Sequence, residues 1–276
     1  MIQDISPSRL INAYNDQQPQ NGDSILLFDD EGKALLGSEN GQIVFLDISD
    51  LNDARTVYLF SIDEKRFFLS LGNPVKDKDG FEYHSIRDVR DRFADASKVE
   101  VYAVFTAYHL WKWYSDNKYC GKCRTALSLG TKERSLVCPA CGNTVYPRIN
   151  PAVIVGVKNG ERLLLTKYRR GYNHNALVAG FTEIGETLEE TVMREVMEET
   201  GLKVKNIRYY KSQPWGMAQD ILMGFYCDVD GDDNIRMDES ELKYAEWVKR
   251  DDIVLQPNNL SLTNEMMQMF KDGNVL

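Results

Sequence analysis

The stretch from Gly180 to Leu202, GFTEIGETLEETVMREVMEETGL, constrains the fold of this chain more than any other part. Thr187 is followed three residues later by Glu190, which is the spacing of a capping box at the start of a helix. Gly201 is of the residue type that most often ends one. Between them, apolar side chains recur at helical spacing, at Leu188, Val192 and Val196. The sequence therefore predicts a loop that leads into a short helix with one apolar face.

The predicted helix carries three acidic residues on one side. Glu195, Glu198 and Glu199 fall at positions i, i+3 and i+4, within an arc of about 100°, and Glu186 precedes them on the loop. Like charges at this spacing repel one another, and a hard cation such as Mg²⁺ or Mn²⁺ removes the conflict. The cluster therefore indicates metal-assisted chemistry on a phosphate-containing substrate. The alternative is a solvated charged face with ordinary intrahelical pairs to Arg194.

The complete spacing of the stretch decides between these interpretations. Gly180 is followed by five residues and then Glu186, and a further seven residues separate Glu186 from Arg194-Glu195-Val196. One residue then precedes Glu198-Glu199, and one more precedes Gly201-Leu202. In this spacing the sequence resembles the Nudix hydrolases, and every fixed position of their box is filled. The resemblance implies hydrolysis of a nucleoside diphosphate linked to another group. It also implies that the three helical glutamates hold the divalent ions.

Length and composition set the limits for the rest of the chain. The 276 residues suffice for two domains, or for one large domain and a small module. The hydrophobic content of 43% is typical of a globular protein, and no apolar run approaches the length that spans a bilayer. The first residues, MIQDISPSRL, lack the pattern of a secretory signal, so we expect a cytoplasmic protein without a membrane partner. The net charge of -9 argues against broad attraction to nucleic acid.

One region has the opposite charge balance. Between residues 118 and 148, Glu133 is the acidic residue that accompanies six basic ones: Lys118, Lys122, Arg124, Lys132, Arg134 and Arg148. The run is interpreted as a solvated face, with a patch for a phosphate-rich ligand as the alternative.

The first part of the chain, residues 1–117, is expected to form a small β-rich α+β domain. Short β-rich runs separated by turn residues occur at residues 24–28, 42–46, 57–62, 66–71 and 81–84. A helical pattern follows from about residue 96 to 117. No catalytic constellation is visible here. His84 and His109 are interpreted as structural or surface residues, because neither has a second candidate at ligand spacing.

Residues 118–147 contain two Cys-x-x-Cys pairs, separated by 14 residues: Cys120 and Cys123, then Cys138 and Cys141. Thiolates at this spacing predict a closed, tetrahedral Zn²⁺ site, and the metal would supply folding energy to a loop too short to bury a core. Two disulfides are the alternative, which a reducing cytosol disfavours. Because zinc ribbons often bind nucleic acid, a recognition or regulatory module without turnover is kept as a second class of function.

The last part, residues 148–276, alternates strands and helices. Strands are predicted at residues 152–157 and 162–167 around a turn at 158–160, and then at 204–210, 221–229 and 246–248. A final amphipathic helix is predicted over residues 261–270. The pattern favours an α/β (α+β) fold with a mixed sheet between helices. It agrees with the α/β/α sandwich that the Nudix resemblance implies.

The order of the motifs points to one branch of that family. The four-cysteine ribbon is followed by Tyr146-Pro147-Arg148, by Pro151-Ala152-Val153-Ile154, by the Nudix box and by Ser212-Gln213-Pro214-Trp215. This order resembles the NADH pyrophosphatase branch. The resemblance implies a homodimer that cleaves NADH or NAD into NMN(H) and AMP, and extends to removal of NAD caps from RNA ends.

The chain departs from that branch directly after the last motif. The branch continues Ser-Gln-Pro-Trp-Pro-Phe-Pro-x-Ser, whereas this chain continues with residues 216–220, Gly-Met-Ala-Gln-Asp. Without two prolines and an aromatic ring, we expect a more flexible loop with less stacking surface, and a negative charge from Asp220 near the substrate. The same chemistry on ADP-ribose, FAD or a diadenosine polyphosphate is therefore an open alternative.

The resemblance also assigns roles to individual residues. Arg194 would orient the glutamates, and Glu186 would support them from the loop. Glu241, in the stretch before the last strand, would join the metal site or act as general base. Further residues would contact the substrate, by stacking on its rings or by hydrogen bonding: Tyr146, Phe181, Gln213 and Trp215.

Overall fold

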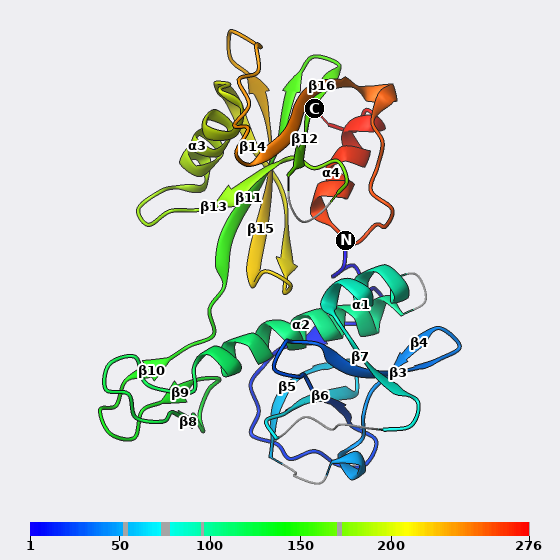
Figure 1. Ribbon diagram of the computed structural model, residues 1–276, viewed down its shortest axis with the longest axis vertical. Coiled ribbons are helices and arrows are strands. Elements are labelled where there is room, and N and C mark those ends of the chain that lie inside the picture. The colour runs from blue at the N-terminus through cyan, green and yellow to red at the C-terminus, as the bar shows by residue number, and fades with distance from the viewer. Residues whose placement is uncertain (52–54, 73–77, 95–96, 170–172, 276) are drawn as a thin grey trace. The chain divides into compact units, whose positions relative to one another are not determined.

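The computed structural model describes residues 1–51, 55–72, 78–94, 97–169 and 173–275. Its chain divides into two units, shown in Figure 1. The C-terminal unit contains residues 1–3, 149–214 and 220–276, and the N-terminal unit contains residues 4–148 and 215–219. The loop at residues 215–219 therefore groups with the N-terminal unit, although the strands on either side of it belong mainly to the other.

A six-stranded mixed sheet forms the centre of the C-terminal unit. Five of its strands run in the order β14-β15-β11-β12-β16, and the sixth, β13, pairs with β11. The pairing of β11 with β15 is parallel, whereas β11 pairs antiparallel with β12 and β13. The strands are β11 (Asn150–Asn159), β12 (Arg162–Tyr168), β13 (Val178–Phe181), β14 (Val204–Trp215), β15 (Asp220–Val229) and β16 (Leu242–Lys249).

Both faces of this sheet are covered by helices, as Figure 1 shows. Val153, Val155 and Val157 of β11 pack in one apolar core with Val192 and Val196 of α3 (Leu188–Thr200). Residues that point to the opposite face belong to a second core against α4 (Leu262–Lys271), because side chains alternate along a strand. The expected α/β/α sandwich with a mixed sheet is confirmed.

Before the cysteine region, the described residues of the N-terminal unit form two small sheets and two α-helices. One sheet has the order β1-β5-β6-β2 and the other the order β4-β3-β7. The elements are β1 (Leu10–Ile11), β2 (Ser24–Leu26), β3 (Ala34–Glu39), β4 (Gln42–Val44), β5 (Thr56–Ile62), β6 (Lys65–Ser70), β7 (Phe81–His84), α1 (Ile86–Phe93) and α2 (Lys98–Asp116). Residue 96, where we expected the helix of this part to begin, lies outside the described residues, and α1 was not predicted.

The same unit includes a small three-stranded sheet around the four cysteines. Its order is β10-β9-β8, formed by β8 (Ser128–Leu129), β9 (Leu136–Val137) and β10 (Thr144–Val145). Within the part of the chain that the structure describes, no helix is both long enough and apolar enough to cross a membrane.

Candidate active site and metal centre

The loop and helix predicted over residues 180–202 form as expected. The Thr187 side chain accepts a hydrogen bond from the Glu190 amide, and the Glu190 side chain accepts one from the Thr187 amide, so the capping box is present. Gly201 ends α3 in the left-handed conformation with φ 69°. Val192 and Val196 are fully buried under the sheet. The orientation of this apolar face places the acidic residues of α3 beside β13.

Arg194 connects the acidic residues to one another. Its Nε and Nη2 donate to the two oxygens of Glu186, at 2.6 and 2.9 Å. Its Nη1 donates to Glu195 at 2.7 Å and to Glu198 at 3.0 Å, and Nη2 also donates to the Phe181 carbonyl at 2.9 Å. All five N–H groups of the guanidinium are used. Ion pairing with Arg194 lowers the pKa of Glu186 to about 2, so Glu186 is a firm anchor for the arginine.

Glu195 lies directly against the backbone of β13. A Cβ added to Gly180 would fall 2.0 Å from the Glu195 carboxylate, so a side chain at position 180 and this rotamer of Glu195 exclude each other. The lack of space beside Glu195 therefore explains why a glycine stands at position 180, the start of the box. Burial raises the pKa of Glu195, which the ion pair with Arg194 opposes.

Glu199 is the most buried member of the cluster. Its side chain is 3% exposed, and its Oε2 has no hydrogen-bond partner among the described residues. Burial, and then the charges of Glu195 and Glu241, raise its pKa to about 8. The Ala179 amide opposes this rise, but a buried carboxylate that has one oxygen without a donor and lies near two other carboxylates favours a proton or a cation.

Glu241 lies in the turn before β16, close enough to Glu195 and Glu199 to act on them electrostatically. Its charge raises the pKa of both Glu195 and Glu199. Tyr168, at the end of β12, also lies close by: its pKa is raised by burial and by these three carboxylates. The sequence analysis missed Tyr168, because no spacing within the chain marks a residue that reaches the site only through the pairing of β12 with β16.

The donor set fits a divalent cation. Three carboxylates, those of Glu186, Glu195 and Glu198, pair with the Arg194 guanidinium, and Glu199 presents a buried oxygen without a donor. All of these carboxylates offer hard oxygen ligands. The carboxylates outnumber the single positive charge of Arg194, so the cluster as a whole is negatively charged. The sequence comparison agrees with this geometry, since the profile of the NUDIX domain matches residues 148–270. Residues 148–270 of this chain are thus similar to a NUDIX domain.

Several curated proteins and solved structures are similar to part of this chain. Two proteins named NAD-capped RNA hydrolase NudC, from Enterobacter sp. (strain 638) and from Shigella flexneri, are each 42% identical to this chain over 149 residues. The matches cover 54% of this chain, and 57% and 58% of the two relatives. The chain thus matches little more than half the length of these relatives. A NUDIX hydrolase structure from Nitrosomonas europaea covers 56% of this chain and 90% of its own, with 21% identity and a TM-score of 0.49.

Outside the Nudix domain, the four cysteines come together. Cys120, Cys123, Cys138 and Cys141 place their sulfur atoms within 4.8 Å of one another. The Sγ atoms of Cys120 and Cys141 are 3.7 Å apart, and those of Cys123 and Cys138 are 3.3 Å apart. A tetrahedral ion with metal–sulfur bonds of ~2.3 Å would separate its ligands by about 3.8 Å. The four cysteines can therefore hold a metal ion.

The two cysteine pairs are built alike. The amide of Cys120 donates to the Thr125 carbonyl, and the amide of Cys138 donates to the Asn143 carbonyl, both at 2.8 Å. The residue after each second cysteine, Arg124 or Gly142, has a positive φ, of 65° or 71°. Each pair thus forms a tight turn that directs both thiols to one point. Hydrogen bonds with Thr125 lower the pKa of Cys123 to about 6, which favours the thiolate that a metal needs.

The predicted basic face is less continuous than the sequence implied. Arg134 is half-buried, and its guanidinium donates to Asn12 Oδ1 and to the Leu59 carbonyl. Arg148 is exposed but donates to Gln219 Oε1 at 2.9 Å. His109 binds the Arg148 carbonyl through Nε2, so it is a structural residue, as expected.

The residues expected to contact substrate differ in accessibility. Phe181 is 52% exposed and lies on β13 beside Arg194, and Tyr146 is 55% exposed in the N-terminal unit. Trp215 is half-buried, and its ring packs 5.5 Å from that of Phe105. The exposed rings of Phe181 and Tyr146 are open to a ligand.

Gln213 does not have the environment of a ligand contact. Its side chain is fully buried. Its Nε2 donates to the Leu260 carbonyl at 2.7 Å, and its Oε1 accepts from the Leu262 amide at 2.7 Å. The side chain thus fixes the start of α4. Contact of Gln213 with substrate stays a prediction, and in this arrangement its side-chain amide is already hydrogen-bonded within the protein.

Two expectations for the altered loop need correction. Asp220 does not present a free charge: it is 5% exposed, Oδ1 lacks a partner among the described residues, and burial raises its pKa to about 7. Nor is the loop loosely tied, since a Cβ at Gly216 would fall 2.0 Å from the Phe105 carbonyl of α2. The Gln219 amide also donates to the Gly216 carbonyl. Glycine here permits close packing.

Proposed function

We propose that this protein hydrolyses the pyrophosphate bond of NAD-type dinucleotides, yielding NMN(H) and AMP, and that NAD-capped RNA ends are among its substrates. The observation that carries the proposal is the pair of carboxylates, Glu195 and Glu198, held by Arg194 on the same helix as the buried, unpartnered oxygen of Glu199. The two relatives named NAD-capped RNA hydrolase NudC support the choice of substrate.

Mg²⁺ or Mn²⁺ would be held by Glu195, Glu198 and Glu199, with Glu241 as a fourth ligand or as the general base. The ion would neutralise the pyrophosphate and lower the pKa of the attacking water. Arg194 keeps the carboxylates of Glu195 and Glu198 in place through charge-assisted hydrogen bonds. Phe181 and Tyr146 would stack on the rings of the dinucleotide, and Trp215 would shape the neighbouring loop.

The other parts of the chain complete the proposal. We propose a domain at residues 1–117, a ribbon at 118–147 in which the four cysteines bind structural Zn²⁺, and the catalytic domain at 148–276. Thiols kept as zinc ligands suit a reducing compartment, so we place the protein in the cytoplasm. The resemblance to the NADH pyrophosphatase branch suggests a homodimer, which light scattering of the purified protein would test.

A substrate panel tests the function. The purified protein is incubated with Mg²⁺ or Mn²⁺, or with EDTA, and the products are separated by chromatography. The substrates are NADH, NAD, NAD-capped RNA, ADP-ribose, FAD and diadenosine polyphosphates. We expect metal-dependent release of AMP and NMN(H), with the highest kcat/KM for NADH, NAD or the capped RNA.

Two outcomes would contradict the proposal in different ways. A higher kcat/KM on ADP-ribose, FAD or a diadenosine polyphosphate would show that residues 216–220 have redirected specificity while the chemistry stands. Absence of turnover on every substrate, together with salt-dependent RNA binding, would instead support a nucleic-acid-binding module.

A further inference from the structure

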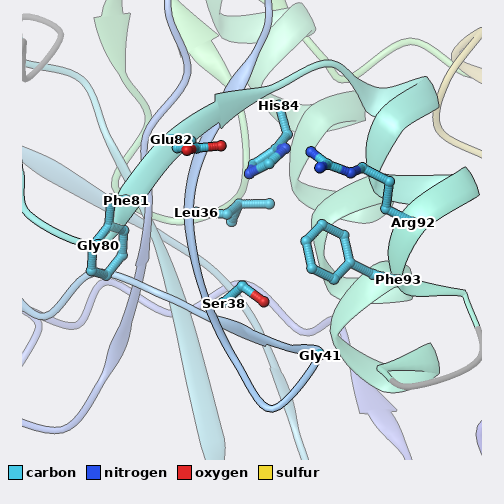
Figure 2. A pocket seen from close by; sticks show the side chains of 9 residues that line it. All are labelled: Leu36, Ser38, Gly41, Gly80, Phe81, Glu82, His84, Arg92 and Phe93. Atoms are coloured by element: carbon cyan, nitrogen blue, oxygen red, sulfur yellow. The ribbon is translucent and has the colours of Figure 1, made fainter.

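The N-terminal unit contains a cavity of about 500 Å³ between the β4-β3-β7 sheet and α1 (Figure 2). This volume is in the range of sites that enclose a small molecule, roughly 300–1,000 Å³. Leu36 of β3, Phe81 of β7 and Phe93 of α1 supply an apolar lining. All the lining residues belong to this one unit, so the cavity is separate from the glutamate cluster of the Nudix domain.

His84 is the buried polar group of this cavity. It is 6% exposed, and its ring meets that of Phe93 edge to face, with centroids 5.6 Å apart and an interplanar angle of 89°. Among the described residues, neither ring nitrogen has a hydrogen-bond partner. The ring nitrogens are not among the fully buried atoms that lack a partner, so they face the open space of the cavity, where a ligand can bind them.

Two charged side chains lie on either side of His84, as Figure 2 shows. Arg92, in the last turn of α1, and Glu82, on β7, both line the cavity. Within the described ranges, neither forms a hydrogen bond or an ion pair. The neighbouring Arg90, by contrast, pairs with Asp91 at 2.7 Å. The cavity thus keeps a guanidinium and a carboxylate that are both available to a ligand.

The cavity groups match three features of a ligand. An anionic group would bind Arg92 and accept a hydrogen bond from His84. Ring N–H donors would bind the Glu82 carboxylate, and a flat ring would pack on Phe81 and Phe93. Inorganic anions have only the first feature. We propose that this cavity is a second ligand site that binds a mononucleotide, with its phosphate at Arg92 and His84 and its base between the phenylalanine rings.

The ionisation of His84 reports directly on whether a ligand occupies the cavity. Burial and the charge of Arg92 lower its pKa, whereas Glu82 and Asp88 oppose that effect. A bound phosphate would add negative charge beside the ring and raise the pKa again. The chain has 3 histidines, so each gives a resolvable NMR signal.

AMP is the probe, added to the full-length protein without Mg²⁺ or Mn²⁺ and followed by calorimetry and by histidine NMR. We expect AMP to bind, the His84 signals to shift and the pKa of His84 to rise. Arg92→Gln should weaken binding roughly tenfold or more, because a charge-assisted contact is lost. Arg87→Gln is the matched control: it removes the same charge from the same helix, outside the cavity, and should leave AMP affinity unchanged.

Inorganic phosphate and adenosine are titrated separately, and each should bind more weakly than AMP. Phosphate binding as tight as that of AMP would overturn the mononucleotide assignment. Unmoved His84 signals, or equal AMP affinity in Arg92→Gln and the unaltered protein, would overturn the site itself. The inference does not depend on hydrolysis, since a Glu199→Gln protein should still bind AMP in this cavity.

Discussion

Arg194 and the carboxylates around it illustrate how single residues determine this site. The guanidinium uses all its donors on Glu186, Glu195, Glu198 and the Phe181 carbonyl. Glu199 remains outside this network, buried and without a donor for Oε2 among the described residues. The two kinds of carboxylate differ in purpose: Glu186 fixes the arginine, whereas Glu199 is the group that most needs a cation.

Glu199→Gln should abolish most of the activity while the fold remains intact. The change keeps the shape of the side chain and removes the charge that a divalent ion requires, so we expect kcat to fall by about a hundredfold or more. Glu198→Gln should act in the same direction. Turnover is measured on the best substrate of the panel, and circular dichroism checks the fold.

The matched control is Glu189→Gln, which removes an exposed charge from the first turn of the same helix. It should retain nearly full activity. A folded Glu199→Gln protein with near-normal kcat would refute the assignment of the metal ligands.

Asp220→Asn should stabilise the protein at high pH. Burial raises the pKa of Asp220 from 3.8 to about 7, so between these values the folded state holds a proton that the unfolded state has lost. Stability therefore falls as pH rises through this window and levels off above it. Asparagine does not ionise and so avoids this loss. We expect the free energy of unfolding of Asp220→Asn to exceed that of the unaltered protein by on the order of 2 kcal/mol at pH 8, and by less toward pH 5.

Urea unfolding at pH 5 and pH 8 measures this effect. The exposed Asp251→Asn serves as control and should change stability little at either pH. If Asp220→Asn stabilised the protein equally at both pH values, the conclusion that Asp220 is buried and protonated would be wrong.

At the scale of elements, the link from β14 to β15 depends on close packing. β14 carries Gln213, which fixes the start of α4, and then the chain passes through Trp215 and Gly216. These two residues pack on Phe105 of α2. A loop that lacks the prolines of the related branch is thus held by a ring contact and a glycine.

Gly216→Ala should destabilise the protein by about 1–3 kcal/mol, because the new methyl group would fall 2.0 Å from the Phe105 carbonyl. Urea unfolding measures the loss, and the substrate panel would report any change in preference. Gly121→Ala, whose Cβ would meet nothing within 4 Å, is the control. Equal stability of the two variants would show that the loop is not packed in this way.

At the scale of the whole molecule, we propose that Zn²⁺ stabilises the fold of residues 118–147 and that Mg²⁺ or Mn²⁺ takes part in hydrolysis. The ribbon strands β8, β9 and β10 have two residues each, which is too little to hold a sheet together without a cross-link. A metal ion held by the four cysteines would provide that link.

Cys138→Ser should lower the bound zinc to a small fraction of one equivalent and increase proteolysis within residues 118–147, because metal binding supplies the folding energy there. Atomic absorption measures the zinc. Cys227→Ala, which changes a buried cysteine of the sheet, should keep the full zinc content. Full zinc occupancy in Cys138→Ser would contradict the four-cysteine site.

Much of this architecture could be predicted from local patterns. The capping box at Thr187, the glycine stop at Gly201 and the 3.6-residue period between them depend on interactions within a few residues, so α3 was predicted closely. The ends of the sheet strands were less accurate, and β13 was missed. Its four residues form a strand only because β11 pairs with them.

The sequence by itself determined which residues were predicted to bind metal, since the spacing of the glutamates and of the cysteines is a property of the chain. Only the tertiary structure decided how each carboxylate is used. Burial separates Glu199 from Glu198, close contact explains Gly180, and strand pairing brings Glu241 and Tyr168 to the cluster. It also decided that Gln213 and Asp220 are enclosed, because burial depends on residues far away in the chain that no local pattern reveals.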